Sequence, residues 1–170
     1  MIHGRFQPFH NGHLEYLRAA LGRGETLLIG ITNPDPTQSS AEATSDHRHL
    51  DEANPYTFFQ RLVMIREVLR DEGIPSDDAI IVPFPVNFPD RWRYYLPTDV
   101  VHYIRVFSAW EQSKVDRLCE YGYRVEVLHP GAEKAVEATE VRRRIASGER
   151  WEDLVPPAVA RVIRRLPEIA

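Results

Sequence analysis

The alternation of strand-like and helix-like segments along the chain constrains the fold more than any other feature. Apolar runs with strand character cover residues 26–32, 79–84, 100–107 and 123–128. Amphipathic segments alternate with them, at about 12–21, 57–73 and 111–121, and two more helices are expected at 139–147 and 157–165. Alternating strands and helices imply βαβ units. We therefore expect an α/β fold with three α/β/α layers and ligands at the carboxyl ends of the strands.

The first strand has little room, because only Met1 to Arg5 precede the turn at Pro8. A central strand of a parallel sheet normally runs about five or six residues. We expect either a short strand or a natural start upstream, and favour the second. The 170 residues suit a single domain, with a core at 1–130 and a C-terminal helical segment at 131–170.

Composition and charge exclude several classes of protein. The net charge of -4 and the pI near 6.0 argue against a protein that spreads over nucleic acid, since such binding needs a basic face. No apolar run approaches the roughly 20 residues that span a bilayer, and no signal peptide is evident. The single cysteine, Cys119, rules out an intrachain disulfide and favours a cytoplasmic location. Its helical surroundings predict a packed thiol.

The segment between the first expected strand and helix carries the strongest chemical signal. It reads Gly4-Arg5-Phe6-Gln7-Pro8-Phe9-His10-Asn11-Gly12-His13, with Asn11 able to cap the helix. His10 and His13 place imidazole donors beside backbone N–H groups and the positive end of a helix dipole. Gly12 keeps a side chain out of an anion's path. This pattern predicts a phosphate site; the alternative is a turn with a capping asparagine and two surface histidines.

The ten-residue string resembles the nucleotidylyltransferase superfamily with the His-x-Gly-His signature, and within it the archaeal-type nicotinamide mononucleotide adenylyltransferases. The resemblance covers almost the whole chain. Residues 54–61, which begin Asn-Pro-Tyr-Thr and end at Arg61, look like that family's Asn-Pro-Phe-Thr…Arg segment. Residues 137–143, Glu-Ala-Thr-Glu-Val-Arg-Arg, resemble its Ser-Gly-Thr-Glu-Val-Arg-Arg helix start, and residues 148–159 match its tail. The resemblance implies a Rossmann-like fold with a mostly parallel five-stranded sheet and C-terminal helices.

The resemblance also implies roles for individual residues. His10 and His13 would bind the triphosphate and stabilise charge on the α-phosphate, as catalytic residues together with Arg142. The remaining implied nucleotide- and substrate-binding residues are Gly4, Arg5, Phe6, Gln7, Gly12, Arg61, Trp92 and Thr139. Nucleotidyl transfer depends on alignment and charge neutralisation, and needs no nucleophilic side chain. Arginine suits such a site because its fork binds phosphate oxygens in pairs while staying charged.

Metal binding is expected mainly through the nucleotide. Mg²⁺ would bridge the phosphates and help pyrophosphate to leave, and the sequence shows no dedicated protein cage for it. His47 and His49 could bind a transition metal, although a solvated lid between about 34 and 54 is the favoured interpretation. In the run Arg142-Arg143-Arg144, successive side chains point about 100° apart on a helix, so Arg142 is chosen as the ligand residue and the other two as solvated or paired.

Two segments depart from the family pattern where the acceptor and the base are chosen. Residues 107–112, Phe-Ser-Ala-Trp-Glu-Gln, replace the family's Ser-Gly/Asn-Asn-Pro-Leu-Val stretch, and residues 130–136 replace its basic, aromatic loop. Trp92 matches the family tryptophan that stacks on the nicotinamide ring, but Pro89 stands where a polar residue is expected. Trp92 either stacks on an aromatic acceptor or packs ahead of Tyr94 and Tyr95.

Three functions remain open. The leading hypothesis is transfer of AMP from ATP to nicotinamide mononucleotide, giving NAD and pyrophosphate, with small molecules as partners and neither nucleic acid nor membrane. The alternative keeps the fold and chemistry but uses another nucleotide, such as CTP, or another phosphate or phosphonate acceptor. A nucleotide-binding regulatory module without turnover is the third. Members of the resembled family commonly form multimers, so a homo-oligomer is a further expectation.

Overall fold

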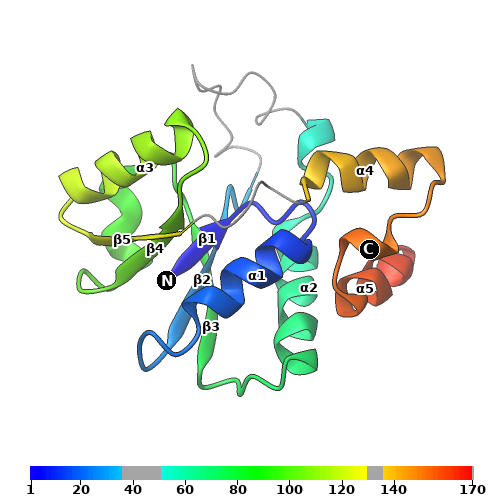
Figure 1. The fold of residues 1–170 in the computed structure, drawn as a ribbon, viewed down its shortest axis with the longest axis horizontal. Helices are drawn as coiled ribbons and strands as arrows, with labels where there is room; N and C mark the ends of the chain where they lie inside the picture. The colour runs from blue at the N-terminus through cyan, green and yellow to red at the C-terminus, as the bar shows by residue number, and fades with distance from the viewer. Residues whose placement is uncertain (36–50, 130–135, 170) are drawn as a thin grey trace.

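The computed structural model describes residues 1–35, 51–129 and 136–169 (Figure 1). Its main elements, in chain order, are β1 (Ile2–Gly4), α1 (Asn11–Ala20), β2 (Leu27–Thr32), η2 (Asp51–Ala53), α2 (Phe58–Asp71), β3 (Ala79–Phe84), η3 (Pro89–Tyr94), β4 (Val101–Arg105), α3 (Ala109–Glu120), β5 (Arg124–Leu128), α4 (Ala138–Ser147), η4 (Glu152–Leu154) and α5 (Pro157–Ile169). Strands and helices alternate, so the expected α/β class is confirmed.

All strand pairs are parallel, in a three-stranded sheet β1-β2-β3 and a two-stranded sheet β4-β5. Met1 joins the two: its N donates to Val101 O at 2.6 Å and its O accepts from Tyr103 N at 2.8 Å. The five strands therefore follow the order 3-2-1-4-5. The expected continuous five-stranded ladder is interrupted between β1 and β4, because β1 has only three residues and the junction rests on Met1 alone. The carboxyl ends of all strands meet at one edge.

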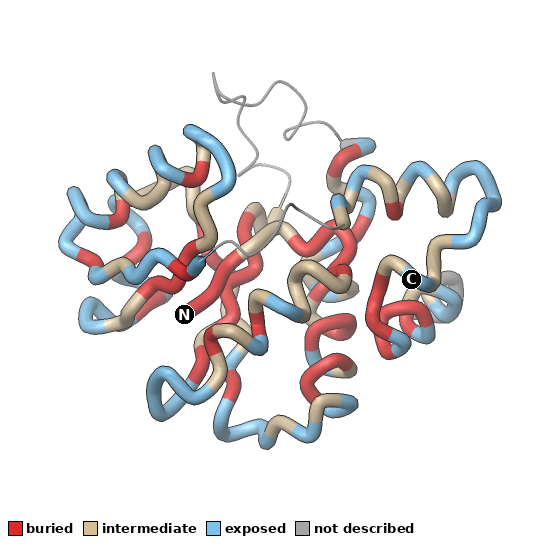
Figure 2. The backbone as a smooth tube through the Cα atoms, viewed as in Figure 1, coloured by how far each residue is buried: buried red, intermediate tan, exposed pale blue. Residues whose placement is uncertain are grey.

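Two apolar clusters cover the opposite faces of the sheet. Side chains alternate along each strand, so Ile2 lies in the larger cluster and Met1 in the smaller one. The larger cluster is completed by α1, α2, α4 and α5, and the smaller one by η3 and α3. Figure 1 shows α3 beside β4 and β5, away from α2 and α5, and Figure 2 shows the buried residues following the strands and the inner sides of the helices.

Gly30 permits close packing within the smaller cluster. A Cβ at this position in β2 would lie 2.3 Å from the Met1 methyl carbon and 3.1 Å from the Cβ atoms of His3 and Phe84. Real Cβ atoms do not approach that closely, so only glycine fits here. The side chains of the β1 segment and of β3 can therefore meet over β2.

Helix ends follow local sequence signals. Thr57 caps α2 and forms a capping box with Gln60, as its position predicted. In α1 the expected cap is wrong: the helix begins at Asn11 and His10 is the N-cap, while the Asn11 amide donates to Asp153 O at 2.9 Å. Gly148 ends α4 in the left-handed conformation with φ 70°.

The C-terminal helices share the main core. Val141 of α4 and Val159 and Val162 of α5 belong to the same cluster as Ile2 of β1. Within the described ranges, no helix is long and apolar enough to cross a membrane. Cys119 is exposed, contrary to the packed thiol expected from its helical surroundings.

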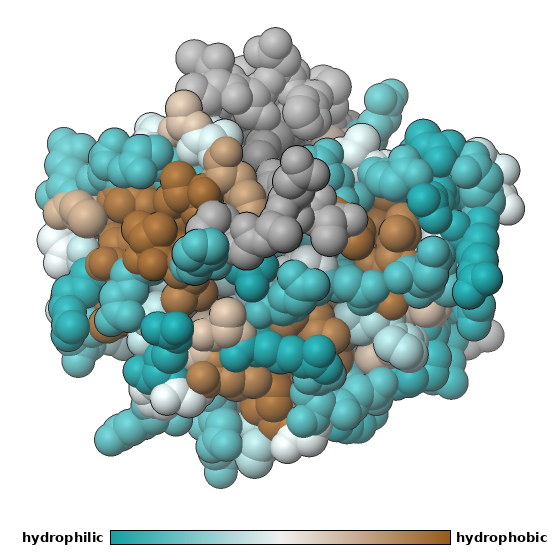
Figure 3. All heavy atoms as spheres, viewed as in Figure 1, coloured by the Kyte–Doolittle hydropathy of each residue, from teal (hydrophilic) through white to brown (hydrophobic). Residues whose placement is uncertain are grey.

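Apolar atoms gather at the surface near the α3–β5 end of the molecule (Figure 3). Exposed large side chains include Phe107 before α3, Tyr121 after it, and Val127 in β5. Assembly with further copies of the chain stays a prediction.

Candidate active site at the carboxyl edge of the sheet

His10 and His13 lie at the start of α1, directly after the turn that follows β1. Their rings stack with centroids 3.7 Å apart and an interplanar angle of 28°. Phe6 packs edge-on against His13 at 4.8 Å, and Phe9 lies 5.4 Å from the same ring. These contacts fix the imidazole pair at the N-terminus of α1, where the helix dipole favours an anion.

A backbone hydrogen bond orients the ring of His13. His13 Nδ1 accepts from the N–H of His10 at 3.2 Å. A neutral imidazole that accepts at Nδ1 carries its proton on Nε2. His13 can therefore donate from Nε2 to a phosphate oxygen without becoming a cation.

A side chain at Gly12 would press against the imidazole pair and touch a neighbouring segment. A Cβ at Gly12 would lie 3.2 Å from His10 Cε1 and 3.8 Å from Val136 O. The predicted reason for Gly12 was to leave space for the anion; the structure adds that it leaves space for the His10 ring. The closeness of Val136 O also brings the segment before α4 against the start of α1.

Arg142 links the two segments that are predicted to bind phosphate. Its Nη1 donates to Gln7 O at 2.7 Å, and its Nη2 to the Thr139 hydroxyl at 3.3 Å. Burial lowers the pKa of Arg142, and the nearby Tyr56 hydroxyl partly opposes the shift. The N-terminal N–H groups of α4, where Thr139 lies, thus face the same region as the α1 N-terminus.

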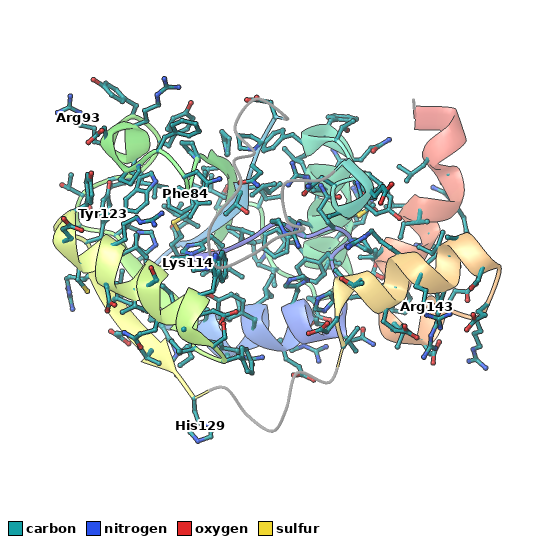
Figure 4. The ribbon with its side chains drawn as sticks, turned by 90° about the horizontal axis from the view of Figure 1, so that it is seen from above. Phe84, Arg93, Lys114, Tyr123, His129 and Arg143 are labelled. Atoms are coloured by element: carbon teal, nitrogen blue, oxygen red, sulfur yellow. The ribbon has the colours of Figure 1, made fainter. Side chains whose placement is uncertain are left out.

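Neighbouring arginines of α4 take other partners, as predicted. Arg143 pairs with Glu140 and Glu149, and Arg144 with Glu140 and Asp153. Figure 4 shows Arg143 on α4, far from Lys114 and Phe84. Arg142 is therefore the arginine of this run that reaches the turn before α1, at Gln7 O.

Gln7 and Arg5 fasten the same loop to residues 54–56. The Gln7 amide donates to Tyr56 O and accepts from Tyr56 N, both at 2.9 Å. Arg5 Nη1 reaches Asn54 Oδ1 at 3.4 Å. The side chain of Gln7 is thus a bridge inside the protein, and a nucleotide contact by Arg5 stays a prediction.

Arg61 has a different role from the one predicted for it. Its side chain is 2% exposed and its guanidinium donates to four backbone oxygens, of Arg5, Thr32, Asn33 and Thr57, at 2.8–3.3 Å. Burial lowers its pKa to about 10. Arg61 joins the ends of β1 and β2 to α2 instead of presenting its fork to a ligand, although its charge still lies behind the site.

Phe6 and Gly4 also support the site, because they pack together at the start of the turn that leads to α1. Phe6 is 1% exposed, has φ 53°, and stacks on Phe9 at 5.4 Å. A Cβ on Gly4 would lie 3.1 Å from the Phe6 ring. Such a backbone conformation is unusual for a bulky residue and is typical of functional turns. Any ligand contact by these two residues must use their backbone.

Trp92 is not placed to stack on an acceptor, so this prediction is corrected. The side chain is 1% exposed, and its indole N–H donates to Pro85 O at 3.0 Å. Phe84, Tyr121 and Tyr123 surround the ring at centroid distances of 5.5–5.9 Å. The other interpretation of Trp92, as a packing residue, is the one that the structure supports.

Residues 107–112, which depart from the family pattern, lie after β4 and form the start of α3. Ser108 caps the helix: its hydroxyl accepts from Trp110 N and donates to Glu111 Oε2 at 2.5 Å. Glu111 is buried. The segment therefore borders the point between β1 and β4 where the strand order reverses, which is where ligands bind in such sheets.

Some predicted residues lie outside the described part of the chain. His47 and His49 are among them, and so are residues 130–135. Among the described residues, no group of three or more His, Cys, Asp and Glu side chains could hold a metal ion.

Sequence reasoning missed two buried histidines. His3 lies in β1 and His102 in β4, at 3% and 0% exposure. Their signal was an ionisable residue inside an apolar strand, in Met1-Ile2-His3 and Val101-His102-Tyr103.

Comparison with known proteins gives the family of the chain. A family model described as cytidylyltransferase-like matches residues 1–144. A phosphonoformate cytidylyltransferase from Streptomyces viridochromogenes is 47% identical over 96% of this chain and 89% of its own length. A nicotinamide-nucleotide adenylyltransferase from Thermococcus kodakarensis is 34% identical over 96% of this chain and 80% of its own length.

Solved structures agree on the fold. A bifunctional NMN adenylyltransferase/ADP ribose pyrophosphatase from Francisella tularensis matches with a TM-score of 0.70 at 19% identity over 98% of this chain. The same enzyme complexed with AMP and Mn ion matches with a TM-score of 0.63 at 21% identity over 91% of this chain. The chain spans about half the length of these structures, 48% and 44%. With the His10–His13 segment and the relatives above, the chain belongs to the cytidylyltransferase-like family and is a nucleotidyltransferase.

Proposed function

We propose that this enzyme transfers the cytidylyl group of CTP to a small phosphonate or phosphate acceptor and releases pyrophosphate. Burial of Trp92 is the structural observation that carries the proposal, because a ring-bearing acceptor would need a stacking surface. The relatives point the same way: identity is 47% to the phosphonoformate cytidylyltransferase and 34% to the nicotinamide-nucleotide adenylyltransferase, over the same 96% of the chain. Adenylyl transfer to nicotinamide mononucleotide, the leading hypothesis from the sequence, thus becomes the second candidate.

The chemistry requires no covalent intermediate with the protein. An acceptor oxygen attacks the α-phosphorus of CTP, a new P–O bond forms, and the bond to the bridging oxygen of pyrophosphate breaks. His13 Nε2 would donate to the α-phosphate as charge grows there. The N-termini of α1 and α4, with Arg142 between them, would hold the triphosphate in line for the attack.

A divalent cation is part of the proposal. The cation would enter with the nucleotide and be held by its phosphates. Mg²⁺ bound in this way would neutralise charge on the leaving pyrophosphate.

Pyrophosphate release from a panel of substrates tests the proposal. CTP and ATP are each combined with phosphonoformate, methylphosphonate and nicotinamide mononucleotide. Release should be fastest with CTP and a small phosphonate. Faster release with ATP and nicotinamide mononucleotide would refute the assignment, and tight nucleotide binding with no release under any pairing would identify a regulatory module.

Replacement of His13 tests the site separately from the substrates. His13→Ala should lower kcat by about 100-fold or more while CTP affinity stays within a few-fold, since the donor acts on charge that develops in the transition state. Arg143→Ala is the control, because Arg143 pairs with Glu140 and Glu149 on the outside of α4. Equal losses in kcat and CTP affinity would mean that His13 only binds the ground state.

A further inference from the structure

The two outer strands of the order 3-2-1-4-5 differ in how well their edges are protected. Within the described residues, β3 pairs only with β2 and β5 only with β4, so each has one side without a strand partner. Pro83 lies within β3, and a proline on an edge strand offers no N–H to a further strand. Strand β5 reads Arg-Val-Glu-Val-Leu and contains neither proline nor lysine. Its edge is therefore open to another strand.

Apolar side chains are exposed beside this open edge. Val127 of β5 lies on the same face as Tyr123 and Val125, which contact the smaller apolar cluster under α3, yet it is 57% exposed. Tyr121, between α3 and β5, is 43% exposed. Figure 3 shows apolar atoms gathered at the surface near this end of the molecule. An exposed apolar patch along a free strand edge is typical of a contact surface.

The charges of β5 are complementary to those of a second, antiparallel β5. If two copies pair about Val125, Arg124 of each lies opposite Glu126 of the other, because the two residues flank the centre. Both side chains are exposed, and residues opposite each other in an antiparallel pair point to the same face with Cβ atoms about 4.5–5.5 Å apart. Parallel pairing in register would instead place like charges opposite each other.

Within one copy, Glu126 has only a distant partner. Its carboxylate lies 3.8 Å from Arg23 Nη1, and both side chains are about half exposed. An ion pair of this kind contributes little to stability. Glu126 can therefore turn to an arginine on a neighbouring strand at small cost.

The same antiparallel pairing covers the exposed apolar side chains. Val127 of each copy lies opposite Tyr123 of the other and diagonal to Tyr121, within reach of an aromatic side chain. The twofold axis of such a pair is perpendicular to the sheet, so α3 of both copies lies on the same face. Val127 of one copy would thus pack against the carboxyl end of α3 in the other.

We propose that β5 pairs antiparallel with β5 of a second copy of this chain, about a twofold axis near Val125, so that one sheet continues through both copies. A twofold contact uses the same surface on each copy and closes, which leaves no free β5 edge. The strands of the two copies run in opposite directions. Their carboxyl ends, which carry the His10–His13 segments, therefore face opposite ways, and pairing leaves both sites open.

Charge reversal and rescue test this pairing. Sedimentation velocity of the wild type should show a concentration-dependent dimer of twice the 19.6 kDa chain mass. Arg124→Glu and Glu126→Arg each place like charges opposite each other at two symmetric positions, and each should raise the dimer Kd about tenfold or more. The double variant restores opposite charges and should return the Kd to within a few-fold of wild type. Arg150→Glu is the control, because Arg150 is 83% exposed and lies between α4 and α5.

A polar substitution tests the apolar contact separately. Val127→Asn should also raise the dimer Kd, whereas its circular dichroism spectrum should match wild type because Val127 is exposed in the single chain. A monomer at every concentration would overturn the proposal and leave the β5 edge to a strand of a different protein. A dimer that both charge reversals leave unchanged would also overturn it, because the contact would then lie on another surface.

Discussion

Acidification should destabilise this protein through two neutral, buried histidines. His102 is 0% exposed and its folded-state pKa is lowered to about 3 by burial, and burial also holds the pKa of His3 well below its ordinary value. In the unfolded chain both return to about 6.5. Between these values the unfolded state binds more protons than the folded state, so the free energy of unfolding must fall as the pH falls from about 6.5.

The size of the effect follows from the two pKa values. Between pH 7.5 and 5.5, protonation in the unfolded state removes about 1.4 kcal/mol of stability for each histidine that stays neutral when folded. His3 and His102 together should therefore cost about 3 kcal/mol over this interval, which is a large share of the stability of an ordinary domain. The depressed carboxyl groups of Glu140 and Glu149, with pKa values of about 2, titrate below this window even when unfolded.

Urea unfolding at pH 7.5 and 5.5, followed by circular dichroism, measures this difference directly. His102→Leu should lose about 1.4 kcal/mol less than the wild type over the interval, and the double variant with His3→Leu about 3 kcal/mol less. Each comparison is made within one variant, so any effect of the substitution itself cancels. The same pH dependence in wild type and variants would show that the rings accept protons in the folded state, and would refute their neutral state.

Two further substitutions test the architecture of the active site. Arg61→Met should lower the free energy of unfolding by about 3–5 kcal/mol, because it removes a buried guanidinium that donates to four backbone oxygens. Arg66→Met, exposed on the same helix, should change it by less than about 0.5 kcal/mol. Similar values for the two variants would contradict the role of Arg61. Gly12→Ala should lower kcat about tenfold or more, because the added methyl group displaces the His10 ring. Gly24→Ala is the control and should leave kcat unchanged, since a Cβ there meets nothing within 4 Å. Unchanged turnover in Gly12→Ala would show that the position of His10 is not critical.

Local signals were sufficient for much of the fold. Alternating patterns placed β3 at its observed bounds and the other strands and helices within a few residues. The Thr57 cap of α2 and Gly148 after α4 depend on neighbours in the sequence and were predicted for that reason. The His10 cap was not, because the next residue, Asn11, is a commoner capping residue, and its amide instead donates to the distant Asp153 O.

Some residues of the candidate site were likewise predictable from local motifs, and the contacts of others were not. The His10–His13 segment and the Thr139–Arg142 helix start are local motifs, and their residues were identified from the sequence. The partners of Arg61 come from β1, β2 and α2, so no sequence window contains them. The motif that contains Arg61 therefore predicted the right position and an incomplete role.

By itself, the sequence determined the α/β class and the segments predicted to bind phosphate, because each depends on residue types at short spacing. Nucleotidyl transfer followed from the resemblance of these segments to a known family. Only the tertiary structure decided that Trp92 is enclosed by Phe84, Tyr121 and Tyr123 and that His3 meets His102 across the β1–β4 junction. Side-chain burial and contacts between distant strands depend on how the sheet and α3 pack, and residue types along a strand cannot specify that packing.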